Sequence, residues 1–259
     1  MGIQVTNLAK IFDSNQGQVQ ALAEVSFAVT SQEFVSIVGP SGCGKSTLLR
    51  ILAGLIEPSR GKFAIDVESG NHRPQNAMVF QGQGLFPWMN LLDNVGFGMK
   101  MRGARPAEIK SEVMGILSQF GLEKFHAHFP HELSGGMRQR AALARAFLAD
   151  PDVLLMDEPF GALDAQSRLL LQQELLRIWQ ANRKTILFVT HDIEEAILLS
   201  DRIIIMSGRP GRIIEDINIP LKRPRNLVEP EEHELIGELK GKIWNMLESE
   251  VKSSMEESL

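Results

Sequence analysis

Residues 39–47 read GPSGCGKST, and this stretch decides the fold class. It fits the pattern Gly-x-x-x-x-Gly-Lys-Ser/Thr, with the apolar run FVSIV (34–38) before it and the helical pattern LLRILAGL (48–55) after it. In such a strand–loop–helix, glycines let successive backbone N–H groups face an anion at the helix N-terminus. The stretch therefore predicts an α/β fold with a loop that binds the phosphates of a nucleotide.

Two side chains of this loop have expected roles of their own. Lys45 should reach the β- and γ-phosphates, and the Ser46 hydroxyl should bind Mg²⁺. Cys43 stands at a variable position of the pattern, so we interpret it as a small loop residue and not as a nucleophile. The predicted nucleotide contacts of the loop are Gly39, Pro40, Ser41, Gly42, Cys43, Gly44, Lys45, Ser46 and Thr47.

Carboxylates follow a second apolar run, in VLLMDEP at 153–159. Asp157 should emerge at the C-terminal end of a buried strand, which is where ligands of α/β sheets bind, and should hold Mg²⁺ through water. Glu158 is placed to act as the base for a water that attacks the γ-phosphate. The stretch predicts the hydrolytic half of a nucleotide site.

Two further polar side chains also follow strand-like runs. His191, in VTHD (189–192), is expected to contact the γ-phosphate, and Gln81, at the end of AMVFQ (77–81), to bind Mg²⁺ or orient the water. The predicted catalytic residues are thus Glu158, His191, Lys45 and Gln81, and the predicted magnesium ligands are Ser46, Gln81 and Asp157.

The order of patterns outside these motifs predicts the organisation of the chain. Further strands are expected at TILFVT (185–190) and RIIIM (202–206), with helices beginning after the N-caps Asp164 and Asp192. Strands that alternate with helices predict a mainly parallel sheet. The interval of about 88–150 lacks strand patterns, and its stretch PAEIKSEVMGILSQF is amphipathic, so we expect a helical insert there.

We expect residues 1–219 to form one domain that contains this insert, and residues 220–259 to form a helical extension. The extension should place Leu235, Leu239, Ile243 and Met246 or Leu247 on one face. A terminal helix that packs on the core is favoured here over a regulatory tail.

Composition excludes several other classes of protein. A net charge of −5 without a basic stripe argues against nucleic acid as a partner, and the single cysteine excludes an internal disulfide. The N-terminus has no secretory pattern, and no apolar stretch approaches the roughly 20 residues that span a bilayer. Its Met-Gly-x-x-x-Thr start fits a loose myristoylation pattern, but IQVTNL is better interpreted as a strand. We expect a protein that is soluble or held to a membrane only by a partner.

The stretch LSGGMRQR at 133–140 resembles a second anion site, because a serine and two glycines open an alanine-rich helix. It has no lysine of its own. The order of GPSGCGKST, VFQ, LSGGMRQR, VLLMDEP, GALD (161–164) and VTHD resembles the ATP-binding subunit of an ABC transporter over roughly residues 1–215. The resemblance implies an ABC ATPase core with an N-terminal antiparallel part, and ATP and Mg²⁺ as cofactors.

The resemblance also explains the missing lysine. In this family two copies meet head to tail, so the resemblance implies that Ser134, Gly135 and Gly136 cap the nucleotide held by the Lys45 loop of the other copy. Asp164 is expected to cross to that copy as well. Phe12 stands where the family stacks an aromatic ring on adenine, and Val19 is expected beside the same nucleotide.

The sequence FPW at 86–88 and the stretch MSGRPGRI at 206–213 resemble importers of nitrate, sulfonates and taurine. This implies a separate membrane permease that contacts Phe86, Trp88 and Met89, an extracellular or periplasmic solute-binding protein, and a place on the cytoplasmic face of the membrane. The alternatives left open are importers of vitamin or pyrimidine precursors or aromatic acids, an exporter, a ribosome- or DNA-acting ABC ATPase, a P-loop kinase or nucleotide switch, and a non-enzymatic regulatory subunit.

Overall fold

The computed structural model describes residues 2–14, 17–66, 73–82, 84–161, 163–223, 225 and 230–256. They fall into two compact units, residues 1–66 with 185–259 and residues 67–184. Ala162 of the GALD stretch and residues 224, 226–229 and 257–259 of the expected extension lie outside the described residues.

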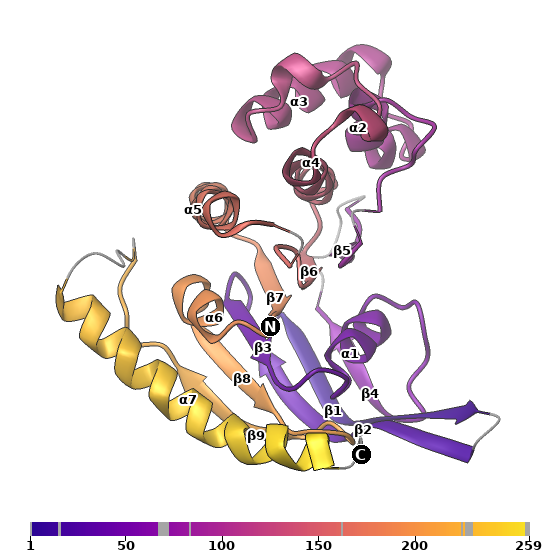
Figure 1. The fold of residues 1–259 in the computed structure, drawn as a ribbon. Coiled ribbons are helices and arrows are strands. Elements are labelled where there is room, and N and C mark those ends of the chain that lie inside the picture. The colour runs from indigo at the N-terminus through magenta and orange to yellow at the C-terminus, as the bar shows by residue number, and fades with distance from the viewer. Residues whose placement is uncertain are drawn as a thin grey trace. The chain divides into compact units, whose positions relative to one another are not determined.

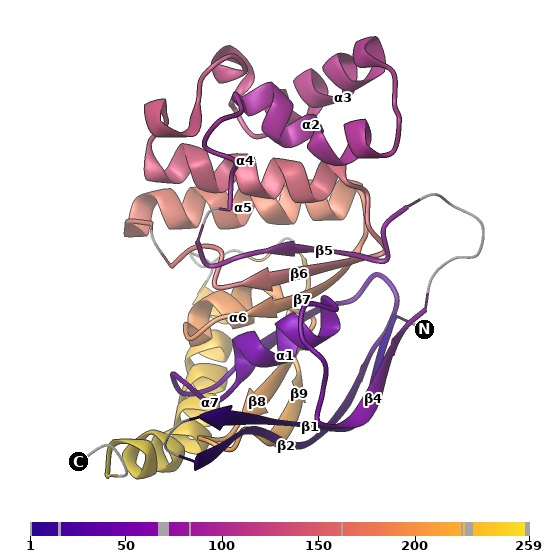
Figure 2. The same ribbon diagram turned by 90° about the vertical axis from the view of Figure 1, so that its right-hand side faces the viewer.

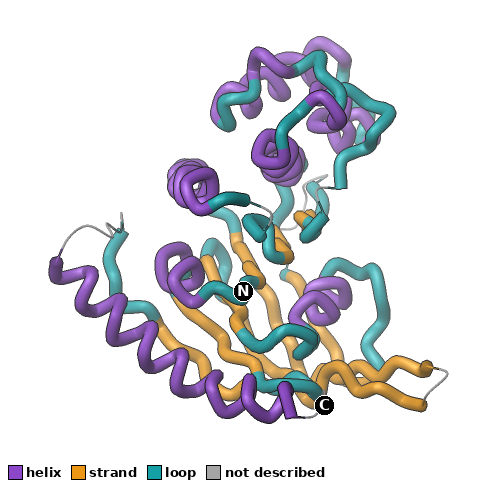
Figure 3. Tube along the Cα trace, viewed as in Figure 1, coloured by secondary structure: helices purple, strands orange, loops and turns teal. Residues whose placement is uncertain are grey.

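The first unit begins with an antiparallel sheet. Strand β1 (Ile3–Ser14) pairs with β2 (Gly17–Val29) along one edge and with β4 (Arg60–Ile65) along the other. Figure 3 shows β1 and β2 as two long orange segments side by side. This is the N-terminal antiparallel part that the family resemblance implied, and it is confirmed.

The first unit also contains the strands that carry the phosphate loop. Strand β3 (Phe34–Val38) pairs in parallel with β7 (Thr185–Val189) and β8 (Arg202–Met206), and β9 (Ile213–Asn218) runs antiparallel to β8. All residues of β3 and β7 are buried. Continuous burial explains why their sequences are mostly apolar and do not alternate with polar residues, because strands of a covered parallel sheet have no solvent face.

Three helices belong to the same unit: α1 (Lys45–Leu52), α6 (Ile193–Leu199) and α7 (Pro230–Glu256) (Figure 1). Asp192 caps α6, accepting hydrogen bonds from the backbone N–H groups of Glu194 and Glu195 at 2.9 and 3.2 Å. The predicted N-cap is confirmed.

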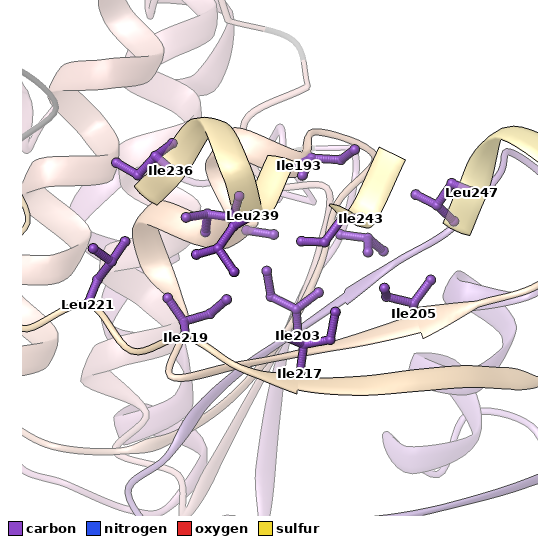
Figure 4. Packing of buried hydrophobic residues seen from close by; sticks show 13 residues of the cluster. Ile193, Ile203, Ile205, Ile217, Ile219, Leu221, Ile236, Leu239, Ile243 and Leu247 are labelled. Atoms are coloured by element: carbon purple, nitrogen blue, oxygen red, sulfur yellow. The ribbon is translucent and has the colours of Figure 1, made fainter. Parts of the chain in front are cut away.

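Helix α7 packs on the sheet through one apolar face. Ile236, Leu239, Ile243 and Leu247 are buried against β8, β9 and α6, as Figure 4 shows. The spacing of three and four residues places them on one side of a helix. The prediction is confirmed for Leu239, Ile243 and Leu247; Leu235 packs against the same cluster but is only partly buried, and Ile236, which was not predicted, is buried.

Replacing Ile243 by Ala is expected to lower the free energy of unfolding by about 2–5 kcal/mol, because it leaves a cavity at a fully buried position. Urea denaturation followed by circular dichroism measures the change. Asn245→Ala, on the exposed side of the same helix, should change stability by no more than about 0.5 kcal/mol. Equal losses in both variants would contradict the packing of α7.

The second unit combines two parallel strands with helices. Strand β5 (Asn76–Val79) pairs with β6 (Val153–Asp157). The helices and 3₁₀ turns are α2 (Leu91–Met101), α3 (Pro106–Gln119), η1 (Glu123–Phe125), η2 (Pro130–Glu132), α4 (Gly135–Leu148) and α5 (Ala165–Ala181). Helices α2, α3 and α4 pack on one another (Figure 2), and the predicted helix at 106–120 is confirmed as α3.

A search of the described residues for a helix both long and apolar enough to cross a membrane finds none.

Candidate functional site

The phosphate loop lies between the end of β3 and the start of α1. Gly42 and Gly44 have φ angles of 76° and 102°, in the left-handed region that favours glycine. A Cβ atom on Gly44 would lie 2.7 Å from both Ala21 O and Leu22 Cδ2. The glycines are therefore required by the path of the loop, and α1 begins directly at Lys45.

Lys45 folds back across this loop. Its Nζ donates hydrogen bonds to Gly39 O at 2.7 Å and Pro40 O at 2.8 Å, and the residue is only 5% exposed. The ammonium group is thus held against the concave backbone where phosphate oxygens would be expected. Burial raises the pKa of the neighbouring Cys43 thiol, which favours its protonated form and fits the interpretation of Cys43 as a loop residue.

His191 leaves the same edge of the sheet as the phosphate loop. Ile37 of β3 and Val189 of β7 are paired in register, and Thr190 N donates to Ile37 O at 3.2 Å. The loop starts at Gly39, two residues after Ile37, and His191 comes two residues after Val189. Parallel pairing thus explains why both segments of the first unit emerge at the same edge.

Phe12 and Val19 lie directly opposite each other on β1 and β2. The Phe12 ring is 39% exposed, and Lys10 Nζ lies 5.0 Å from its centroid. The two residues expected beside the adenine are therefore brought together, and the exposed ring offers a face on which a base can stack.

In the second unit, parallel pairing of β5 and β6 unites Gln81 with Glu158. Val79 is in register with Met156, and Gln81 Nε2 donates to Glu158 Oε2 at 3.0 Å. Asp157, at the end of β6, is 2% exposed. Glu158 has a φ of 44°, an unfavourable conformation for a side chain with a Cβ, and such outliers cluster at functional sites.

The stretch LSGG opens helix α4. Ser134 is its N-cap, and its Oγ accepts a hydrogen bond from Met137 N at 3.3 Å. A Cβ on Gly135 would meet nothing within 4 Å, and one on Gly136 would meet Leu163 Cδ2 at 3.6 Å, an ordinary contact. The fold of this unit therefore does not require glycine at either position, and the two glycines place no side chain over the first turn of the helix.

Asp164 caps helix α5. Its Oδ1 accepts from Ser167 N at 2.9 Å, and hydrogen bonding from Ser167 lowers the pKa of the carboxyl group. The predicted N-cap is confirmed.

The apolar loop Phe86–Met89 is held in shape by a residue that the sequence did not single out. Asn94 is fully buried; its Oδ1 accepts from Phe86 N at 2.7 Å, and its Nδ2 donates to Phe86 O, Met89 O and Asn90 O at 2.9–3.0 Å. The ring of Phe86 lies 5.5 Å from that of Trp88, whose side chain is 69% exposed. An asparagine inside an otherwise apolar helix face was the available signal.

Arg145 of α4 contacts the same loop and was also missed. Its Nη1 donates to Gly84 O at 2.9 Å, and its guanidinium lies 5.6 Å from the Phe86 ring. Burial lowers the pKa of Arg145, and no carboxylate in the described part of the chain pairs with it. The helix that starts with the LSGG stretch is thereby joined to the loop that follows Gln81.

These residues suit ATP and a hard cation. Backbone N–H groups around the two left-handed glycines, with Lys45, form a cradle for phosphate, and the exposed Phe12 ring offers a surface for the base. The side chains expected to bind the metal, Ser46, Gln81 and Asp157, all offer oxygen atoms, which Mg²⁺ prefers. Lys45, Ser46 and His191 belong to the first unit; Gln81, Asp157, Glu158 and Ser134 belong to the second.

Several proteins named as ATP-binding proteins of ABC transporters or importers are similar to this chain over most of its length. An uncharacterized ABC transporter ATP-binding protein of Methanocaldococcus jannaschii is 45% identical over 98% of this chain and 94% of its own length. A taurine import ATP-binding protein of a Jannaschia species is 42% identical over 99% of both chains. An aliphatic sulfonates import ATP-binding protein of Bacillus thuringiensis is 44% identical over 87% of this chain and 89% of its own.

A solved ABC transporter cassette, MJ0796, has the same fold, with a TM-score of 0.75 and 32% identity over 85% of this chain and all of its own; its structures include a dimer and a post-hydrolysis state with ADP and Pi. A sequence model described as ABC transporter matches residues 22–161, more than half of the chain. Both results agree with the fold of the structure and with the family that the sequence motifs resemble. The chain belongs to the ABC transporter family, as one of its ATP-binding and ATP-hydrolysing subunits.

Proposed function

We propose that this subunit powers the import of a small organosulfonate or related anion through a separate membrane permease. The observation that carries the proposal is the 42–44% identity, over most of the chain, to subunits named for the import of taurine and aliphatic sulfonates. The FPW sequence at 86–88 supports it. The proposal places the subunit on the cytoplasmic face of the membrane, held there by its permease and served by a solute-binding protein.

We propose the following division of labour in hydrolysis. Lys45 neutralises charge on the β- and γ-phosphates, His191 contacts the γ-phosphate, and Glu158 accepts the proton of the attacking water. Gln81 holds Glu158 through the 3.0 Å hydrogen bond and positions the water. Mg²⁺, when bound, would neutralise charge on the phosphates, and its proposed ligands are Ser46, Gln81 and, through water, Asp157.

The nucleotide is proposed to lie between two copies of the chain. Gly135 and Gly136 support this proposal because the packing of their own unit requires neither of them, and their lack of side chains lets a phosphate of the other copy approach the N-terminus of α4. Ser134 would add its hydroxyl, and Asp164 would reach the same interface. The MJ0796 cassette, which forms a dimer, is similar in fold. The arrangement is isologous and predicts two-fold symmetry.

The loop with Phe86, Trp88 and Met89 is the proposed permease contact. We expect Trp88→Asp to weaken co-purification with the permease, because it places a charge on an exposed apolar surface that would be buried in the complex. ATP binding by the isolated subunit should be unchanged. Affinity capture of a tagged permease measures the first effect and calorimetry the second. Loss of both together would indicate misfolding and contradict the docking role.

The transport function is tested with purified subunit, permease and binding protein in proteoliposomes. Taurine and alkanesulfonates are added outside the vesicles together with the binding protein. They should stimulate ATP hydrolysis and accumulate in vesicles that enclose ATP and carry the subunit on their inner face. Nitrate and an aromatic carboxylate serve as competing solutes. Stimulation only by a vitamin precursor or an aromatic acid would reject the proposed substrate class while leaving the ATPase assignment intact.

We further propose that residues 1–219 act as the ABC ATPase domain, with the helical region at about 88–150 as an insert, and that residues 220–259 are an extension of it.

A further inference from the structure

Two features of the first unit have no part in the proposed ATP cycle: the loop at 207–212, with the sequence SGRPGR, and the C-terminal helix α7. They are in contact with each other. The Glu250 carboxylate of α7 accepts a hydrogen bond from Gly208 N at 2.8 Å. A hydrogen bond to an ionised acceptor is stronger than one between neutral groups, so this contact is well suited to hold a loop.

The 207–212 loop has a defined backbone. Ser207 N donates to Arg212 O at 2.9 Å, and Arg212 N donates to Ser207 Oγ at 3.0 Å, which closes the loop on itself. Gly211 exchanges hydrogen bonds with Ala21 and Ala23 of β2 at 3.0 and 2.9 Å. Gly208 therefore belongs to a loop that is closed by its own hydrogen bonds and tied to β2.

The phosphate loop rests on these same residues. A Cβ on Gly211 would lie 2.1 Å from Cys43 O, so the two backbones approach as closely as glycine permits. A Cβ on Gly39 would lie 2.9 Å from Met206 O, and Arg209 Nε donates to Gly42 O at 3.4 Å. The contacts are spread along the phosphate loop from Gly39 to Cys43.

Helix α7 is itself firmly anchored. Glu250 follows the buried Leu247 by three residues, so it continues the apolar face shown in Figure 4. Nearer the N-terminus of the same helix, Lys240 forms an ion pair with Glu194, which lies in the first turn of α6, three residues after His191. Helix α7 thus contacts the 207–212 loop, which lies against the phosphate loop, and the start of α6, which follows His191.

We infer that Glu250 is a positioning residue for the nucleotide site: it fixes the 207–212 loop, on which the phosphate loop rests, and thereby raises the affinity of the subunit for ATP. The C-terminal helix is then a brace for the site. The inference depends on the proposed role of the Lys45 loop.

The test measures ATP binding to the isolated subunit by calorimetry, in EDTA to prevent hydrolysis. Glu250→Ala should weaken binding at least about fivefold, the lower end of typical coupling between sites. Glu250→Gln should lose less affinity than Glu250→Ala, because its amide oxygen still accepts from Gly208 N, although this hydrogen bond is weaker than one to a carboxylate. The matched control is Glu248→Ala, on the same helix, whose carboxylate pairs with Lys252.

A double-mutant cycle separates positioning from general destabilisation. Arg209→Met should also weaken ATP binding, and Glu250→Ala with Arg209→Met should be no weaker than the worse single variant, because both act through one loop. Wild-type affinity in Glu250→Ala, an equal loss in Glu248→Ala, or additive losses in the double variant would each overturn the inference. Lys45→Ala is included as a separate arm, since unchanged affinity there would instead reject the phosphate-loop assignment.

Discussion

Glu158→Gln is expected to hydrolyse ATP about 100- to 10,000-fold more slowly than the wild type while binding ATP with similar affinity. Glutamine has nearly the same shape and its amide oxygen can still accept from Gln81 Nε2, so the edge formed by β5 and β6 should be preserved. An amide does not accept the proton of an attacking water. Single-turnover phosphate release measures the rate, and calorimetry measures the binding.

A conservative change elsewhere in the second unit provides the control for this variant. Glu112→Gln removes an exposed carboxylate from α3 and should leave the rate of ATP hydrolysis unchanged. Equal rates for Glu158→Gln and wild type would defeat the assignment of Glu158 as the base. Loss of ATP affinity together with rate would show instead that Glu158 holds the site in shape.

Lys45→Ala and Ser134→Glu are each expected to lower ATP turnover about 100- to 1,000-fold. The first removes the ammonium group that neutralises phosphate charge, and the second places a negative charge next to the γ-phosphate. A mixture of the two proteins should regain activity. In a head-to-tail heterodimer, the intact Lys45 loop of one copy faces the intact Ser134 of the other, which leaves one of two sites complete. Statistical pairing predicts recovery of about a quarter of the wild-type rate at most.

The mixing experiment distinguishes a site shared between two copies from one complete within a single chain. The control is the Lys45→Ala protein alone, at the same total protein concentration as the mixture. Failure of the two variants to complement each other, together with a monomeric Glu158→Gln protein in saturating ATP by gel filtration, would reject the shared site.

Much of the site was predictable because its determinants are local. The phosphate loop is recognised within nine residues from its glycines at 42 and 44 and its lysine at 45. Asp164 and Asp192 predict the starts of the helices that they cap. Apolar runs such as FVSIV predicted buried parallel strands, and parallel strands deliver the residues that follow them to one edge. The meeting of Gln81 with Glu158 follows from that rule, although 77 positions separate them.

Sequence alone thus determined the fold class, the glycine-rich loop and the polar groups that follow the strands, because each depends on backbone preferences or on the regular geometry of a sheet. Only the tertiary structure decided that Asn94 shapes the Phe86–Met89 loop, that Arg145 joins this loop to α4, and that Glu250 holds Gly208. It also showed that Ile236, and not only Leu235, belongs to the buried face of α7. These contacts depend on how loops and helices pack in three dimensions, and no periodic pattern in the sequence records which polar side chain a particular loop backbone will meet.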